Sequence, residues 1–165
     1  MEKEKELREI KTIAKFKTLS IKAKVLKEFY SSFYKGQVFI VAVDGVGIFL
    51  YSLADLKCIK NFPVESSVSF QCVPVFDPST ESIFFSALSK DQLNSTVEKL
   101  SLGDSSVVAT FDLGETVVHS MEVSPFNNGH LLVSSTNEKI FLFSNQLQLL
   151  DQIKLESCHS LSPLS

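Results

Sequence analysis

The sequence predicts an all-β chain built as a tandem array of short antiparallel sheets, because one passage recurs without a gap. Residues 39–52 (FIVAVDGVGIFLYS) and residues 131–144 (LLVSSTNEKIFLFS) match at an offset of 92 residues. A looser copy lies midway, where IFFSAL at 83–88 and VEKLSL at 97–102 echo the first passage. Half of the offset is about 46 residues, and units of this length filled by short strands are typical of β-propeller blades. The expected fold class is therefore a partial β-propeller of about three four-stranded antiparallel blades.

The chain divides into a lead and a body. At 165 residues, with 44% hydrophobic and 21% charged residues, it is long and apolar enough for one globular domain with a core. We expect a basic N-terminal lead at residues 1–20 and a partial propeller at residues 21–165 with a flexible C-terminal end. The expected blades cover approximately residues 25–62, 67–113 and 115–155.

The first unit contains two central strands and an outer one. QVFIVAV is followed by Asp44-Gly45, which predicts a tight two-residue hairpin leading into GIFLYSL. Both runs are apolar at successive positions, which indicates strands buried on both faces. LKCIKNF then mixes Lys57 and Lys60 with apolar neighbours, and this partial polarity is typical of an outer strand that borders solvent.

The second unit has the same order with a longer hairpin. VSFQCVPVF predicts a first strand ending at Phe76, and the turn residues at 77–80 (DPST) separate it from a second strand that begins near Ile83. The next hairpin, SKDQLNST, is about four residues longer than that of the first unit, so it is either a candidate partner contact or a surface excursion. VVATFDLG closes the unit as its outer strand.

The third unit is the most regular. Its first strand runs to Val123, Ser124-Pro125 begins a turn, and Asn128-Gly129 ends that turn. Three further strands are expected near residues 130–135, 139–144 and 147–155.

These units resemble the WD-repeat form of the β-propeller over residues 30–155. The shared order is a strand, an SP or DP turn, LLVSS or IFFSA, a polar pair, and then KIFLFS. The terminal Trp-Asp dipeptide of that family is replaced by Phe143-Ser144 and Tyr51-Ser52. The resemblance implies a scaffold that holds other proteins, although a fold of this kind does not by itself fix an activity.

A narrower resemblance concerns the first unit. The segment IFLYSLADLKCIKNF after a basic lead is similar to the opening blades of WD-repeat subunits of the small-subunit processome, in the subcomplex that links ribosomal RNA transcription to processing. It implies a role in ribosome biogenesis and a nucleolar or nuclear location.

Charge is placed unevenly along the chain. Residues 1–28 contain nine Lys or Arg against five Glu, whereas the remainder has seven Lys against fourteen acidic residues. Arg8 is the single arginine, which argues against a body that recognises nucleic acid, because base and phosphate recognition depends on arginine. The lead itself is either a contact for phosphate without sequence preference or a solvated leader. The candidate partner or phosphate contacts are Lys11, Lys15, Lys17, Lys22, Lys24 and Lys27.

Two structures remain open for this lead. Helical spacing over ELREIKTIAKFK predicts an amphipathic helix that docks on a partner. The alternation of apolar residues with Lys in IKTIAKFK and IKAKVL predicts instead a strand that closes a propeller.

Cysteine content and targeting signals indicate the compartment. Cys58, Cys72 and Cys158 are odd in number and widely spaced, which fits neither a disulfide framework nor a zinc site. The N-terminus lacks the apolar stretch of a signal peptide, and no run approaches the roughly eighteen apolar residues that a membrane helix requires. We therefore expect an intracellular protein without a membrane contact, in the nucleolus or nucleus, with the cytoplasm as the alternative.

The motifs of common enzymes are missing from the sequence. His119 and His130 lack any ligand spacing such as HxxxH, and there is no GxSxG segment. The glycine-rich DGVG at 44–47 lacks the further Gly and Lys of a phosphate loop. The expectation is a non-enzymatic chain with no catalytic, cofactor or metal residues and no small-molecule substrate.

Three blades are too few for a ring, since closed propellers use about four to eight. Apolar faces should then be exposed at both ends, so we expect a fragment, a truncated product or a subunit that another chain completes. The expected function is a protein-interaction scaffold in a multiprotein assembly, with ribosome biogenesis favoured. The alternatives are a propeller adaptor in trafficking, ubiquitin ligation or chromatin, and a propeller enzyme with a site in its channel.

Overall fold

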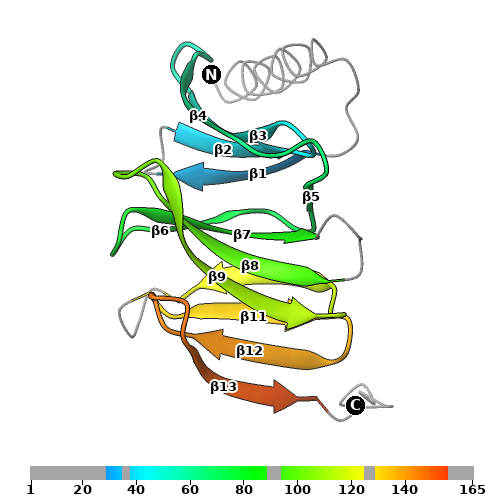
Figure 1. Cartoon of the computed structure of the whole chain (residues 1–165). Helices are drawn as coiled ribbons and strands as arrows, with labels where there is room; N and C mark the ends of the chain where they lie inside the picture. Colours follow the sequence, from blue (N-terminus) through cyan, green and yellow to red (C-terminus); the bar gives the residue numbers. More distant parts are fainter. Residues whose placement is uncertain (1–28, 35–37, 89–93, 125–128, 156–165) are drawn as a thin grey trace, which may run out of the picture.

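The computed structural model describes residues 29–34, 38–88, 94–124 and 129–155. Regular structure in these ranges consists of thirteen β-strands, without a helix. The strands form three antiparallel sheets that follow one another along the chain, and the sheets lie one above another in Figure 1. The expected all-β class with three antiparallel sheets is confirmed for the described part of the chain.

The first sheet is a four-stranded meander in which each strand pairs with the next. Its strands are β1 (Phe29–Tyr34), β2 (Val38–Val43), β3 (Gly47–Ser52) and β4 (Cys58–Pro63). The loop between β2 and β3 holds residues 44–46, because Val43 pairs with Gly47. The expected two-residue hairpin is therefore wrong by one residue. Gly45 supplies the left-handed φ of +64° that this turn requires.

The second sheet has a divided first strand. Its strands are β5 (Ser69–Phe70), β6 (Val75–Asp77), β7 (Ser82–Leu88), β8 (Ser95–Ser101) and β9 (Ser106–Gly114). β5 and β6 pair with opposite ends of β7, so residues 71–74 interrupt the expected continuous strand. Pro74 in this interruption has no backbone N–H to donate to a ladder, which favours a break at this point.

The third sheet repeats the register of the first. Its strands are β10 (Val118–Val123), β11 (Leu131–Ser135), β12 (Lys139–Phe143) and β13 (Leu149–Lys154). Ile40 lies opposite Leu50 in the first sheet, and 92 residues later Leu132 lies opposite Leu142 in the third. The sequence repeat is thus a repeat of strand pairing.

Two apolar cores separate the three sheets. In the first core, Ile40 and Ile48 of the first sheet pack with Ile83 and Phe85 of the second. The second core contains Phe84, on the opposite face of β7, together with side chains of the third sheet that include Leu131, Val133 and Phe143. Neighbouring residues of one strand point to opposite faces, so β7 serves both cores. Burial on both faces, expected for QVFIVAV and GIFLYSL, is confirmed for β2, whereas β3 is only half-buried at Phe49 and Tyr51.

A third apolar cluster covers the other face of the first sheet. Phe39, Val41 and Val43 are buried there, with Phe49 and Tyr51 packed against them. The Phe39 and Tyr51 rings stack with centroids 5.7 Å apart. The expectation of exposed apolar faces at both ends is therefore wrong at the first sheet, where the side chains are buried.

In each sheet the fourth strand is more exposed than the second. The second strands, β2 and β7, are almost fully buried, whereas β13 is exposed along its whole length. Among the first strands, β6 contacts both β1 and β10. Adjacent sheets therefore approach each other through their first strands and present their fourth strands to solvent.

Candidate functional site

The predicted lysine contacts all lie outside the described residues. Lys11, Lys15, Lys17, Lys22, Lys24 and Lys27 belong to residues 1–28. Their role in binding a partner or phosphate stays a prediction. Most of the long hairpin considered as a partner contact, residues 89–93, is also outside the described ranges.

The two described histidines lie in the third sheet. His119 is exposed on β10, and the half-buried His130 directly precedes β11. The carbonyl of His130 accepts the backbone N–H of Ser124 at 2.8 Å, which closes the turn between these strands. Within the residues that the structure describes, no group of three or more His, Cys, Asp or Glu side chains is placed to hold a metal ion.

A buried carboxylate lies between the second and third sheets. Asp77, with 0% of its surface exposed, accepts hydrogen bonds from the backbone N–H of Ser79 at 2.9 Å and from the Ser79 hydroxyl at 2.7 Å. The Thr80 hydroxyl donates to its second oxygen. These bonds explain why DPST forms a turn, since an Asp side chain that binds the backbone two residues on stabilises this geometry. Gly129 of the third sheet abuts this carboxylate.

A buried lysine joins the same two sheets. Lys99 on β8 is only 3% exposed, and its Nζ donates to the carbonyl of Asn145 at 2.6 Å, in the turn between β12 and β13. The ammonium also lies 5.8 Å from the centroid of the Phe84 ring. Burial lowers the pKa of Lys99, and the negative charge of Asp77 partly offsets that effect. The ammonium thus fixes the second sheet to a turn of the third.

The first interface contains a similar contact, made by a lysine of the fourth strand rather than the third. Lys60 on β4 donates through its Nζ to the carbonyl of Leu102, in the turn between β8 and β9. In both interfaces a lysine of the earlier sheet reaches a carbonyl in the turn that follows the third strand of the later sheet.

Side-chain oxygens make a second repeated contact. Asp44 accepts the backbone N–H of Phe70 at 2.8 Å across the first interface. Across the second interface, the side-chain oxygen of Gln71 accepts the backbone N–H of Val118 at 3.1 Å. The same oxygen accepts the hydroxyl of Ser86 at 2.8 Å within the second sheet. Each interface therefore contains one lysine contact and one contact to the first strand of the next sheet. These buried or half-buried polar groups hold the sheets together, and each makes a hydrogen bond within the protein.

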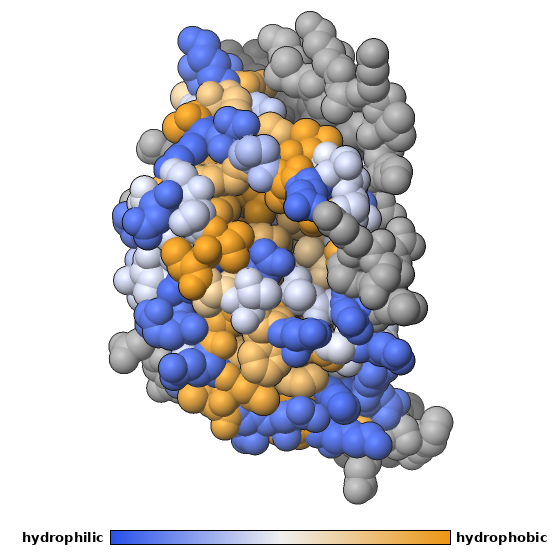
Figure 2. Space-filling model, in the orientation of Figure 1, coloured by the Kyte–Doolittle hydropathy of each residue, from blue (hydrophilic) through white to orange (hydrophobic). Residues whose placement is uncertain are grey.

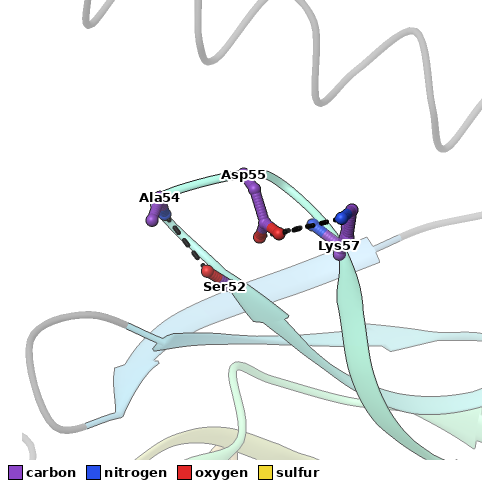
Figure 3. Close-up of polar contacts among 4 residues, drawn as sticks. All are labelled: Ser52, Ala54, Asp55 and Lys57. Atoms are coloured by element: carbon purple, nitrogen blue, oxygen red, sulfur yellow. Dashed lines mark hydrogen bonds and ion pairs between the residues drawn. The ribbon is translucent and has the colours of Figure 1, made fainter.

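The turn between β3 and β4 is closed by its own side chains (Figure 3). The Ser52 hydroxyl accepts the N–H of Ala54 at 3.2 Å, and Asp55 accepts the N–H of Lys57 at 3.3 Å. Hydrogen bonds from Ser52 and then from the Lys57 backbone lower the pKa of Asp55. The ion pair between Asp55 and Lys57, at 3.5 Å, is exposed, and exposed pairs contribute little to stability.

The outer face of the third sheet is the candidate interaction surface. We define this face by two rows of paired residues that point away from the second core: Glu122, Leu132, Leu142 and Asp151, and beside them Ser120, Ser134, Ile140 and Ile153. Leu132 is 39% exposed and Ile153 is 54% exposed. On the side of the molecule that Figure 2 shows, apolar residues reach the surface among polar ones. The outer face differs from scattered exposure because its apolar side chains share one side of one sheet.

Sequence reasoning missed the buried polar contacts between the sheets. Two charged residues in the apolar repeat could have indicated these contacts: Lys99 lies within the strand-like VEKLSL, and Asp77 ends a strand. A charged residue inside an apolar repeat indicates either an exposed edge or a paired buried group, and the sequence does not distinguish between the two.

Comparison with known proteins adds no family to this description. No protein-family model matches the chain, and no curated protein matches it. Among the residues described by the structure, no helix has the length and apolar character needed to cross a membrane.

Proposed function

We propose that the chain is a non-enzymatic protein-interaction scaffold, a segment of a WD-repeat-like β-propeller that acts as a subunit of a multiprotein assembly. The observation that carries this proposal is that the two interfaces between the sheets contain the same kinds of contact. Two successive sheet pairs are joined by an apolar core, a lysine bonded to a turn carbonyl, and a side-chain oxygen bonded to the next first strand. Blades of a propeller are related to their neighbours in this repetitive way.

The arrangement of strands supports the same proposal. The first strands of adjacent sheets are in contact through β6, whereas the fourth strands are exposed. Sheets that meet along one edge and present the other edge to solvent have the radial arrangement of propeller blades. Exposed fourth strands and loops are the surfaces with which such scaffolds hold other proteins.

We further propose that the assembly is the small-subunit processome, in the nucleolus. This choice is supported by the similarity of residues 48–62 to opening blades of WD-repeat subunits of that machinery and by the basic lead before them. The six lysines of the lead would contact RNA phosphates without sequence preference, while the sheets hold protein partners.

Affinity purification of the tagged full chain from cells that express it naturally tests this proposal. The expected result is a stable set of processome proteins together with precursor ribosomal RNA. In a matched variant with the six lysines changed to Gln, the processome proteins should still copurify with the chain, whereas the precursor RNA should not. Nuclease-free buffers are used throughout. Recovery of trafficking, ubiquitin-ligase or chromatin proteins instead would overturn the choice of assembly, and absence of any stable partner would overturn the scaffold role.

A further inference from the structure

We propose that the outer face of the third sheet is a docking face for an antiparallel β-sheet of a partner protein, one that presents aliphatic side chains flanked by Lys or Arg. This inference rests on the proposed scaffold function and deepens it, because it names the surface and the chemistry of the partner.

The repeat identifies this face as one built for packing against a sheet. The residues of the first sheet that pack on the second sheet include Ile40, Ile48 and Leu50. Their counterparts 92 residues later are aliphatic residues of the outer face: Leu132, Ile140 and Leu142. These counterparts have the same pairing register, so they project from the third sheet as their equivalents project from the first.

The face of the first sheet that packs on the second sheet and the outer face of the third sheet differ in exposure. Ile40 is 0% exposed beneath the second sheet, whereas its counterpart Leu132 is 39% exposed. Burial of aliphatic surface is favourable by roughly 25 cal/mol per Å². A protein that covered this face would therefore be stabilised in the same way as the packing of the second sheet on the first. The expected cover is a sheet, because a sheet fills the equivalent position twice within this protein.

Charge specifies which sheet fits. In the first sheet, Lys60 lies opposite Leu50 and donates to the neighbouring sheet. At the equivalent position of the third sheet, Asp151 lies opposite Leu142, and Glu122 ends the same row beyond Leu132. The row is therefore aliphatic in its middle and acidic at both ends, and Asp151 supplies an acceptor where the first sheet has the donor Lys60. The complementary partner carries basic residues at these ends.

The same acids make a second copy of this chain a poor occupant. Two outer faces packed on each other would bring acidic rows together, and like charges across an interface are unfavourable. Self-association is accordingly a result that would contradict the proposal.

Site-specific photo-crosslinking in the full chain tests the docking face. The photo-reactive amino acid p-benzoylphenylalanine replaces Leu132 in one version and Val108, exposed on β9, in a matched control. The proteins are expressed in their native cells, and cross-linked products are identified at the level of peptides. The expected product from position 132 is one peptide of another protein with alternating aliphatic residues and a Lys or Arg. The control should not give this peptide.

A charge variant then separates this inference from the scaffold function. Asp151→Lys, combined with Ile153→Glu, should abolish the cross-link from position 132 without changing the thermal unfolding of the purified chain, because both side chains are exposed. Three results would overturn the docking face while the scaffold function stands, provided that stable partners are still recovered. Position 132 gives no cross-link, it cross-links to another copy of this chain, or its cross-link persists in the charge variant. If no stable partner is recovered at all, both are overturned.

Discussion

At the scale of single residues, stability depends on polar groups that the fold removes from water. Asp77 and Lys99 are both buried between the second and third sheets, and each has its own hydrogen bonds. Burying a charge is costly unless it is hydrogen-bonded and compensated by an opposite charge, which is the role of these contacts.

Replacement of the buried carboxylate should therefore destabilise the protein. Asp77→Asn keeps the size of the side chain but places an amide against a hydroxyl or N–H donor, so we expect a loss of about 1–3 kcal/mol in the free energy of unfolding. Urea denaturation measures this loss. Asp112→Asn, at an exposed position of β9, is the matched control with an expected change within about 0.5 kcal/mol. Equal effects of the two variants would contradict the assigned role of Asp77.

The buried thiol predicts an alkaline dependence of stability. Burial raises the pKa of Cys72 from its ordinary value of 9.0 to about 12. Between these two values the folded state keeps a proton that the unfolded state loses, so the stabilisation is complete below pH 9.0 and disappears as the pH approaches about 12. The slope in this window is about 1.4 kcal/mol per pH unit for one proton.

Urea denaturation between about pH 8 and about pH 10.5 measures this slope. Cys72→Ala should reduce it, because the variant has no thiol to deprotonate in the unfolded state. Cys58→Ala removes an exposed cysteine and should keep the steep slope of the parent. A slope that is the same with and without Cys72 would show that this thiol is not the group responsible.

At the scale of elements, some boundaries follow from local sequence and others depend on neighbours. The strands of the third sheet were predictable because turn residues separate clear apolar runs. β1 was not identified beforehand, although FYSSFY is rich in residues that favour strands, because the preceding segment fits a helix or a strand equally well. Pro74 is a local signal for the division between β5 and β6. The hydrogen bond that Gln71, within this division, accepts from Val118 of another sheet could not be predicted from local sequence.

The turn before β11 provides a prediction at this scale. Gly129 has a left-handed φ of +79°, and an added Cβ would lie 2.6 Å from an Asp77 oxygen. Gly129→Ala should cost more than the roughly 1 kcal/mol of backbone strain alone, because it also displaces the buried carboxylate. Gly114→Ala is the control, since Gly114 has a similar φ of +64° with nothing near its Cβ position. Thermal unfolding of both variants should show the larger loss for Gly129→Ala.

At the scale of the whole molecule, the middle sheet couples the other two. β7 contributes neighbouring side chains to opposite cores, with Phe85 in the first and Phe84 in the second. The sequence predicted three sheets and their order because the repeat is long and regular. It also predicted an exposed apolar face at each end of the array, which is correct for the third sheet. It could not predict that Phe39, Val41 and Val43, at the other end, are buried.

This coupling predicts that the described sheets unfold together. Phe84→Ala removes a fully buried ring and should lower the free energy of unfolding by about 3–5 kcal/mol. Val108→Ala, at an exposed position of β9, should change it by less than about 0.5 kcal/mol. Calorimetry should give one transition for the parent and for both variants. Two resolved transitions in the Phe84 variant would show that the sheets unfold independently.

The lysine contacts also give the row of sheets a direction. Lys60 and Lys99 each reach forward along the chain, from an earlier sheet to a turn of a later one, and none of the described contacts of this kind runs backward. A sheet added after the third would meet Asp151 where a forward-reaching lysine stands in the first sheet. Another molecule of the same chain, arriving in the same orientation, would place a turn carbonyl against that carboxylate. Open-ended head-to-tail stacking, which leads to fibres, is thereby disfavoured at this end of the molecule.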